Sequence, residues 1–226
     1  MNRFQTALRE VPLFNEFSQR ELKVIAQAAT VRRYEKNEVI IHKLERGDTF
    51  FSIIDGRVKV ILSDEDGKEF IVDVLKPKEF FGELALLDGE PRSATVVAQE
   101  PTEVLVLTRE EFLNQLKKHP ELGIKIMRVL GRRLRRANQR IESLAFMDVC
   151  GRLAGTLIDL AASSGEKQSD GVNVPLDFSR TELANLVGTT RETLTRALRT
   201  LQSMGYIKIK KKFVVVTNMK GLEGRM

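Results

Sequence analysis

The stretch that decides the fold is residues 81–96, Phe81-Gly82-Glu83-Leu84-Ala85-Leu86-Leu87-Asp88-Gly89-Glu90-Pro91-Arg92-Ser93-Ala94-Thr95-Val96. A short helix that starts near Gly82 offers free backbone N–H groups to an anion. Arg92 carries a guanidinium that can pair with a phosphate through two parallel hydrogen bonds. Glu83 can accept a hydrogen bond from a ribose hydroxyl. The stretch therefore predicts a binding site for a ligand that carries a phosphate and a sugar.

The residues around this stretch have the pattern of an antiparallel β domain. Short β-rich runs occupy residues 38–42, 49–56, 57–63, 69–75, 93–99 and 104–108. The pairs Gly47-Asp48, Asp55-Gly56 and Asp66-Gly67 are turn signals, and their spacing is typical of a sandwich or barrel. We therefore predict a β-roll, or jelly roll, between residues 31 and 107.

Residues 81–96 resemble the phosphate-binding cassette of cyclic-nucleotide-binding domains. The resemblance assigns ligand contacts to six residues: Gly82 and Glu83 for the ribose, Arg92 and Ser93 for the cyclic phosphate, and Leu84 and Ala85 for backbone contacts. The alternative is a structural ion pair between Arg92 and Glu83, inside a β-roll that has lost its ligand.

A long helix is predicted after His119-Pro120, because about 25 residues follow without a proline or a turn cluster. Its apolar residues are spaced 3, 4, 3, 4 and 3, as one a/d seam of a heptad repeat: Met127, Leu130, Leu134, Ala137, Ile141 and Leu144. Charges on nearly every other face predict no second apolar stripe. We expect a parallel dimer through the seam; the alternative is an amphipathic helix packed on its own domain.

Residues 179–204 have the order of elements of a helix-turn-helix. Ser179 and Glu182 form a capping box that opens a short helix. Gly188 ends that helix, and a longer one starts at Thr189 or Thr190. The β-rich runs YIKIK and FVVVT that follow predict a wing, whereas residues 163–173, SSGEKQSDGVN, predict an exposed loop.

Residues 179–209 are similar to the helix-turn-helix of the family of cyclic-AMP receptor proteins and fumarate-nitrate-reductase regulators. The resemblance implies that Arg191, Glu192 and Arg196 read DNA bases. An arginine fork matches the O6 and N7 acceptors of guanine, and a glutamate can accept from cytosine N4. The alternative for Glu192 is a capping box with Thr189, and for the arginines it is phosphate contact or solvation.

Three further residues are candidates for the phosphate contacts that fix the register on DNA: Arg180, Thr181 and Thr190. This sequence departs from the family at the tip of the wing, where Lys210-Lys211-Lys212 replaces a turn that contains glycine. Their positive charge suits DNA.

Another departure lies on the long helix, where the resemblance places the residues that touch the base of the ligand. Ala137 and Asn138 stand where the family has a threonine and a serine. The amide of Asn138 can bond adenine through two hydrogen bonds; binding guanine or facing water are the alternatives. Cyclic AMP is the first choice of ligand.

The distribution of charge agrees with a nucleic-acid partner for the carboxy-terminal half. Residues 1–120 contain 18 Lys and Arg and 21 Asp and Glu, a net charge of −3, whereas residues 121–226 contain 19 and 10, a net charge of +9. Lysines and arginines that neutralise phosphates gain affinity from the release of counterions.

Residue counts exclude several other sensors. The one cysteine, Cys150, cannot hold an iron–sulfur cluster, and we expect it to be a small buried side chain in a reducing cytoplasm. His42 and His119 are the only histidines, and neither stands at a haem position of the family. No metal-ligand cluster, no catalytic pair of residues and no apolar run of membrane-spanning length is present.

The cassette, β-roll, long helix and helix-turn-helix cover nearly the whole chain, and together they imply an α+β fold. We expect residues 1–118 to form a sensor of cyclic-nucleotide-binding type, residues 119–147 a dimerisation helix and hinge, and residues 148–226 a winged helix-turn-helix domain. The resemblance implies a cytoplasmic homodimer that binds double-stranded DNA, acts with RNA polymerase and is not an enzyme. The alternatives are a regulator without an effector, a cyclic di-GMP-responsive regulator, or a cyclic-nucleotide-binding subunit that does not bind DNA.

Overall fold

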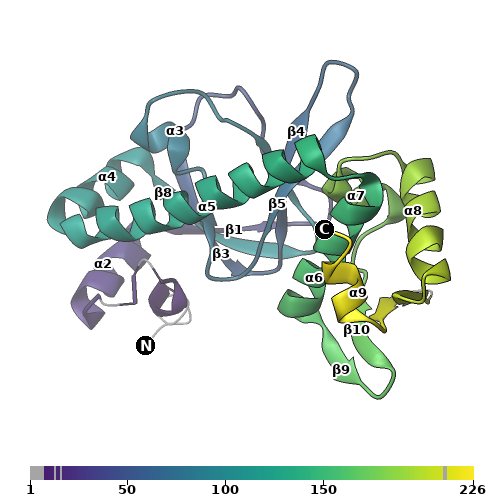
Figure 1. The fold of residues 1–226 in the computed structure, drawn as a ribbon. Coiled ribbons are helices and arrows are strands. Elements are labelled where there is room, and N and C mark those ends of the chain that lie inside the picture. Colours follow the sequence, from purple (N-terminus) through teal and green to yellow (C-terminus); the bar gives the residue numbers. More distant parts are fainter. Residues whose placement is uncertain (1–7, 13, 16, 211–212) are drawn as a thin grey trace. The chain divides into compact units, whose positions relative to one another are not determined.

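The computed structural model describes residues 8–12, 14–15, 17–210 and 213–226 (Figure 1). The chain divides into two compact units, and the boundary between Leu134 of unit 1 and Arg135 of unit 2 falls inside helix α5 (Pro120–Phe146). Within these described ranges, no helix is long and apolar enough to cross a membrane.

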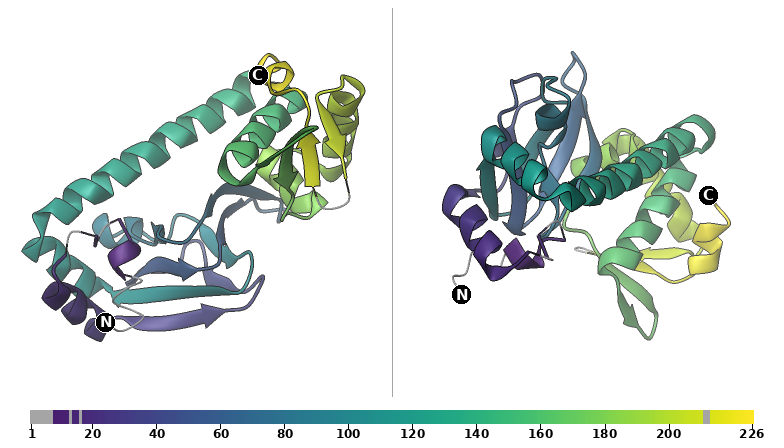
Figure 2. Two further views of the ribbon diagram at one scale, coloured as in Figure 1. Left: turned by 90° about the horizontal axis from the view of Figure 1, so that it is seen from below. Right: turned by 90° about the vertical axis from the view of Figure 1, so that its left-hand side faces the viewer.

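Unit 1 contains two antiparallel sheets of four strands each, in the orders β1-β8-β3-β6 and β2-β7-β4-β5 (Figure 2). The strands are β1 (Thr30–Tyr34), β2 (Val39–Ile41), β3 (Thr49–Asp55), β4 (Val58–Ser63), β5 (Glu69–Leu75), β6 (Phe80–Phe81), β7 (Thr95–Ala98) and β8 (Thr102–Thr108). All six predicted runs form strands, which confirms the β-roll. The sequence did not predict strands β1 and β6, because β1 (TVRRY) has two arginines among its five residues and β6 has only two residues.

Two apolar clusters hold unit 1 together. The first lies between the two sheets and includes Phe51 and Phe81, whose rings stack with centroids 4.9 Å apart. The second lies outside the first sheet and joins Phe50 and Leu107 to the surrounding helices. Those helices are α2 (Gln19–Ala28), α4 (Arg109–Lys118) and the first part of α5. The sheets therefore form a rigid frame for the short helix α3 (Leu84–Leu87) of the cassette.

Helix α5 differs from its prediction in one respect. Leu122 and Ile126 are buried in the second cluster, and Val129 and Leu130 pack against it. The prediction of no second apolar stripe was therefore wrong: the stripe is only about two turns long, and the arginines that follow it hide it in the sequence.

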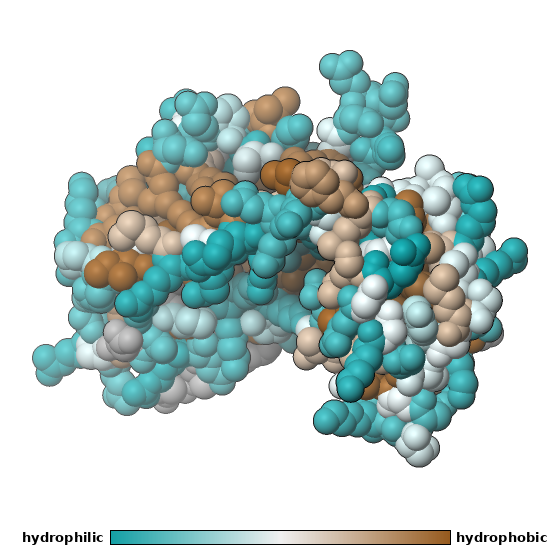
Figure 3. Space-filling model, in the orientation of Figure 1, coloured by the Kyte–Doolittle hydropathy of each residue, from teal (hydrophilic) through white to brown (hydrophobic). Residues whose placement is uncertain are grey.

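The heptad seam of α5 stays largely exposed. Met127, Leu134 and Ile141 are 63%, 64% and 63% exposed. Figure 3 shows apolar residues gathered on the face of unit 1 that lies next to α5. Large apolar side chains at regular spacing on a surface are typical of an interaction site.

Unit 2 consists of the second part of α5, four further helices and one antiparallel sheet, as far as the structure describes it. The helices are α6 (Val149–Ser164), α7 (Arg180–Val187), α8 (Arg191–Ser203) and α9 (Met219–Glu223). The strands are β9 (Glu166–Gln168), β10 (Gly171–Pro175), β11 (Ile207–Ile209) and β12 (Phe213–Val216), in the order β11-β12-β10-β9. Strands β11 and β12 confirm the predicted wing strands, whereas Lys211 and Lys212 at its tip lie outside the described residues.

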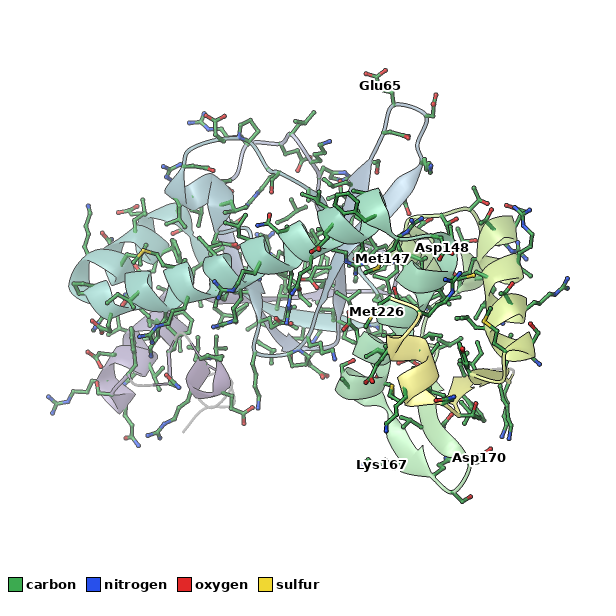
Figure 4. All side chains as sticks on the ribbon, viewed as in Figure 1. Glu65, Met147, Asp148, Lys167, Asp170 and Met226 are labelled. Atoms are coloured by element: carbon green, nitrogen blue, oxygen red, sulfur yellow. The ribbon has the colours of Figure 1, made fainter. Side chains whose placement is uncertain are left out.

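The region predicted as an exposed loop is a hairpin of β9 and β10. Lys167 and Asp170, labelled in Figure 4, lie on this hairpin. Gly171 has a φ of 139°, and a Cβ there would come within 2.2 Å of the Val216 carbonyl oxygen. Gly171, which the sequence analysis took as a sign of a loop, therefore allows β10 and β12 to approach each other closely.

The end of the chain packs against α6. The Arg225 guanidinium pairs with Asp148, the N-cap of α6, at 2.6 Å, and Met226 lies beside Gly155. Figure 4 labels Asp148 and Met226 in this region. Cys150, in the first turn of α6, is half-buried rather than buried as expected.

Candidate functional site

Arg92 lies at the centre of the cassette in unit 1 and is only 5% exposed. Its Nη1 donates to the Gly82 carbonyl oxygen at 2.7 Å. Its Nη2 donates to the Thr49 carbonyl oxygen at 2.8 Å and to the Thr49 hydroxyl at 3.0 Å. The guanidinium also lies 5.8 Å from the centre of the Phe51 ring. These contacts hold the guanidinium in one orientation.

Two glycines make room for this arginine. A Cβ at Gly47 would come within 2.8 Å of Arg92 Nε, and a Cβ at Gly82 would come within 2.7 Å of Arg92 Nη1. Gly82 also has a φ of 81°, which other residues rarely adopt. We call Gly47, Thr49, Phe51 and Gly82 the arginine cradle.

The charge of Arg92 is buried without a directly bonded carboxylate among the described residues. Burial lowers the pKa of Arg92 from its ordinary value, and the nearby Asp48, Glu83 and Glu45 oppose that decrease. A buried cation normally has a hydrogen-bonded anion as its partner. The arrangement therefore suits an anion with several oxygens, such as a phosphate.

Glu83 is paired with an arginine of the long helix. Its carboxylate is 2% exposed and accepts a hydrogen bond from Arg133 Nη1 at 2.7 Å. Arg133 also donates to the Phe80 carbonyl oxygen and lies over the Phe80 ring. Burial raises the pKa of Glu83, and the charge of Arg133 opposes this increase. The sequence-based alternative, in which Glu83 pairs with Arg92, named the wrong partner.

Replacing Arg133 with methionine is expected to raise the pKa of Glu83 further, because burial then acts without the opposing charge. A carboxyl whose pKa is higher in the folded state binds more protons there, so the free energy of unfolding falls as the pH rises through the folded pKa. We expect a loss of about 2–4 kcal/mol at neutral pH that shrinks in acid, measured by urea unfolding at several pH values. Arg132→Met, at an exposed neighbour, is the control; a loss independent of pH would contradict the pairing.

The other predicted ligand residues differ in exposure. Ala85 is 3% exposed and lies against Gly47, whereas Leu84 is 41% exposed and Ser93 is also exposed. The cassette helix starts at Leu84, two residues later than Gly82, and it has only four residues. Asn138 is exposed on the part of α5 that belongs to unit 2, so its contact with a ligand stays a prediction.

The two helices of the helix-turn-helix in unit 2, α7 and α8, begin at residues that the sequence predicts as caps. Ser179 and Glu182 form the capping box of α7, and Gly188 ends that helix with a φ of 74°. Thr190 is the N-cap of α8 and accepts a hydrogen bond from the Thr193 backbone at 3.3 Å. The capping box between Thr189 and Glu192 is therefore ruled out, because the cap lies one residue later than that alternative requires.

The three predicted base-reading residues lie exposed on α8 and share its amino-terminal half: Arg191, Glu192 and Arg196. The opposite face of α8 is buried through Leu194, Ala197, Leu198 and Leu201. The packing of α8 thus leaves the predicted reading face free to enter a groove.

The candidates for phosphate contact are in different settings. Thr181 is exposed, and Thr190 is exposed as the cap of α8. Arg180 is half-buried, and its Nη1 is buried without a hydrogen-bond partner in the described structure. A buried donor without a hydrogen-bond partner is unfavourable, so a hydrogen bond from the Arg180 guanidinium to an external anion would be stabilising.

Two arginines that the sequence analysis missed secure the turn before α8. Arg152 of α6 donates to the carbonyl oxygens of Val187, Gly188 and Met147 at 3.0, 3.1 and 2.8 Å. Arg140 of α5 donates to the Leu186 carbonyl oxygen at 2.7 Å. The bonds to Leu186, Val187 and Gly188 satisfy carbonyl oxygens that the end of α7 leaves unpaired, whereas the bond to Met147 lies at the turn between α5 and α6. Spacing along the sequence does not reveal such partners.

Two known domain families match this chain, one over the cassette and one over the helix-turn-helix. Residues 31–119 match the family described as "Cyclic nucleotide-binding domain", and residues 151–225 match the "Crp-like helix-turn-helix domain". The first range contains the arginine cradle, and the second contains α7 and α8.

Individual proteins are similar over most of the chain. The "cAMP-activated global transcriptional regulator CRP" of Pasteurella multocida is 34% identical over 188 residues, which are 82% of this chain and 89% of that protein. A CooA mutant from Carboxydothermus hydrogenoformans is 26% identical with a TM-score of 0.79 and covers 94% of this chain and 93% of its own. The c-di-GMP-responsive global regulator CLP of Xanthomonas campestris is 26% identical with a TM-score of 0.75 and covers 86% and 96%.

Proposed function

This chain belongs to the Crp-like family of transcription regulators, and on that premise we propose that it binds a palindromic DNA operator as a homodimer under the control of a cyclic nucleotide in its β-roll. Its relatives are regulators of transcription, so the chain is not an enzyme. The match to a Crp-like helix-turn-helix also argues against a regulatory subunit that does not bind DNA.

The observation that carries the sensor assignment is the buried guanidinium of Arg92 in its cradle. In this proposal, Arg92 and Ser93 hold the cyclic phosphate, while Gly82 and Glu83 hold the ribose. Backbone contacts come from Leu84 and Ala85. The ribose hydroxyl then competes with Arg133 for the Glu83 carboxylate, so that ligand binding acts on the long helix.

Cyclic AMP is the proposed effector, because relatives at 34% identity are named as cAMP-activated. Asn138 is the proposed contact to the base. Cyclic di-GMP is the second candidate, since the similar regulator CLP is described as responsive to it. Calorimetric titration with cyclic AMP, cyclic GMP and cyclic di-GMP tests the choice; heat from cyclic di-GMP alone would reject cyclic AMP.

For DNA binding, we propose that the exposed seam of α5 pairs two copies of the chain. The dimer places its two α8 helices about 34 Å apart, the distance between successive major grooves. The ligand favours the state that meets this spacing, by binding it more tightly than the other state. In this proposal, the bases of a half-site resembling TGTGA are read by Arg191, Glu192 and Arg196. The DNA phosphates are contacted by Arg180, Thr181 and Thr190.

The proposed division of the chain is a sensor over residues 1–118, a dimerisation helix and hinge over residues 119–147, and a DNA-binding domain over residues 148–226. We also propose that the protein works in the cytoplasm with RNA polymerase, as family membership suggests.

Replacing Arg196 with alanine tests whether this residue reads a base. We expect a loss of about 1–3 kcal/mol on the preferred operator and relaxed selection at one base pair, because the guanine fork is lost. The measurement is affinity for a series of base-substituted operators, obtained by selection from a random duplex library, and affinity against salt. An equal loss on every sequence, with a salt slope lower by about one unit, would assign Arg196 to phosphate instead.

A further inference from the structure

A chain of hydrogen bonds on α8 ends at Arg196. The Thr190 hydroxyl donates to Thr193 Oγ1 at 3.1 Å, and Arg196 Nη2 donates to the same oxygen at 3.0 Å. The Thr193 backbone N–H in turn donates to Thr190 Oγ1 at 3.3 Å. Thr193 Oγ1 therefore accepts two hydrogen bonds, which occupies both of its acceptor sites.

The Thr193 hydroxyl, which accepts the hydrogen bond from Arg196, is itself held in place by Thr190. Thr193 lies in the first turn of α8, where the N-cap Thr190 holds its backbone, and it is half-buried. Arg196 lies three positions later on an exposed face, and long helical side chains lean toward the amino end of their helix. The Thr193 hydroxyl thus holds one edge of a side chain that would otherwise be free in solvent.

One hydrogen bond leaves most of the guanidinium available. An arginine has five N–H donors, and the bond to Thr193 uses one of them. A side chain already ordered before binding loses less conformational entropy when it meets DNA. An oriented fork also favours a two-point contact with guanine over a single contact with a phosphate.

We propose that Thr193 is a positioning residue that preorganises the Arg196 guanidinium and thereby sharpens the choice of base. The inference rests on the proposed base-reading role of Arg196. Thr193 acts through Arg196, so its effect on affinity is confined to sequences that carry the base read by Arg196.

The test is a double-mutant cycle with Thr193→Val and Arg196→Ala in the full-length protein, with excess cyclic AMP and in parallel without nucleotide. Valine keeps the β-branched shape and the capped backbone but removes the hydroxyl. We expect Thr193→Val to weaken binding to the preferred operator about three- to ten-fold and to leave binding to non-specific duplex unchanged. In the Arg196→Ala background, the same substitution is expected to have no further effect.

Two matched variants separate positioning from a general effect on α8. Thr200 lies seven residues after Thr193, on a similar face of α8, but its hydroxyl donates to the Arg196 backbone carbonyl at 3.1 Å. Thr200→Val is therefore expected to leave the specificity ratio unchanged. Thr193→Ser keeps the hydroxyl and is expected to restore most of the discrimination. Thermal unfolding verifies that each variant is folded.

A second measurement does not depend on DNA. The order parameter of the Arg196 side-chain Nε in the free protein reports how far the guanidinium is restrained. We expect it to fall in Thr193→Val and to stay unchanged in Thr200→Val. An unchanged value in Thr193→Val would overturn the positioning role whatever the role of Arg196.

The outcomes on DNA separate this inference from the proposed function. Additive losses in the cycle that are equal on all sequences would overturn the inference, because Thr193 would then act independently of Arg196, for example by contacting a phosphate itself. A coupled loss that is equal on all sequences would reject base reading by Arg196 and leave its positioning by Thr193 supported.

Discussion

Arg92→Ala is expected to lower the affinity for cyclic nucleotide by at least about 100-fold, because a buried two-point bond between a cation and a phosphate has no substitute in the cassette. Arg92 is 5% exposed, and Gly82 and Thr49 accept hydrogen bonds from its guanidinium. Its removal also takes away the hydrogen bonds that Arg92 donates to the Gly82 and Thr49 carbonyl oxygens, so we expect a modest loss of stability. Calorimetric titration with cyclic AMP and urea unfolding measure the two effects separately.

Arg57→Ala is the matched control for this variant. Arg57 makes a two-point ion pair with Glu100, at 2.9 and 2.8 Å. It follows the carboxy-terminal end of β3, whereas Thr49 of the arginine cradle is the first residue of that strand. Its loss removes a charge and a salt bridge from the same β-roll without touching the cradle. Arg92→Lys keeps the charge but loses the fork, and it is expected to bind weakly. Affinity close to wild type in Arg92→Ala would place the ligand elsewhere.

Leu134→Glu is expected to convert the proposed dimer to monomers and to lower operator affinity by about 100-fold or more. Leu134 is 64% exposed in the single chain and lies at the centre of the seam, so a dimer would bring two glutamates face to face. A monomer engages one half-site and loses the gain in affinity that comes from two linked contacts. Analytical ultracentrifugation and operator titration measure the two consequences.

Gln139→Glu introduces the same charge on the same helix at an exposed position five residues away, off the seam. This control is expected to remain dimeric and to bind DNA as the wild type does. A stable dimer of Leu134→Glu would show that two copies pair through another surface.

Several features of the fold were predictable because short-range interactions produce them. The cap at Ser179 and the stop at Gly188 each depend on residues three or four positions apart. The β-rich runs between turn signals likewise predicted six of the eight strands of the β-roll. The cassette and α8 were predictable for the same reason, since each is a continuous stretch of sequence.

The partners of charged side chains were not predictable in the same way. Arg133 is separated from Glu83 by 50 positions, and Arg92 from Thr49 by 43. Many arginines in the sequence look alike, so a pattern of charges cannot tell which one meets the buried glutamate. The second apolar stripe of α5 was hidden for a related reason, because Leu122 and Ile126 become a core only when the outer face of a sheet lies against them.

The sequence alone therefore predicted most of the helices and strands, the two continuous stretches that carry the candidate sites and the residue types that these stretches present. Only the tertiary structure decided that Arg92 is buried in the arginine cradle, that Glu83 pairs with Arg133 of the long helix, and that Arg140 and Arg152 bind the turn before α8. The physical reason is range. Caps and periodicity act within a few residues, whereas the energy of a buried charge depends on desolvation and on partners that folding brings together from distant segments.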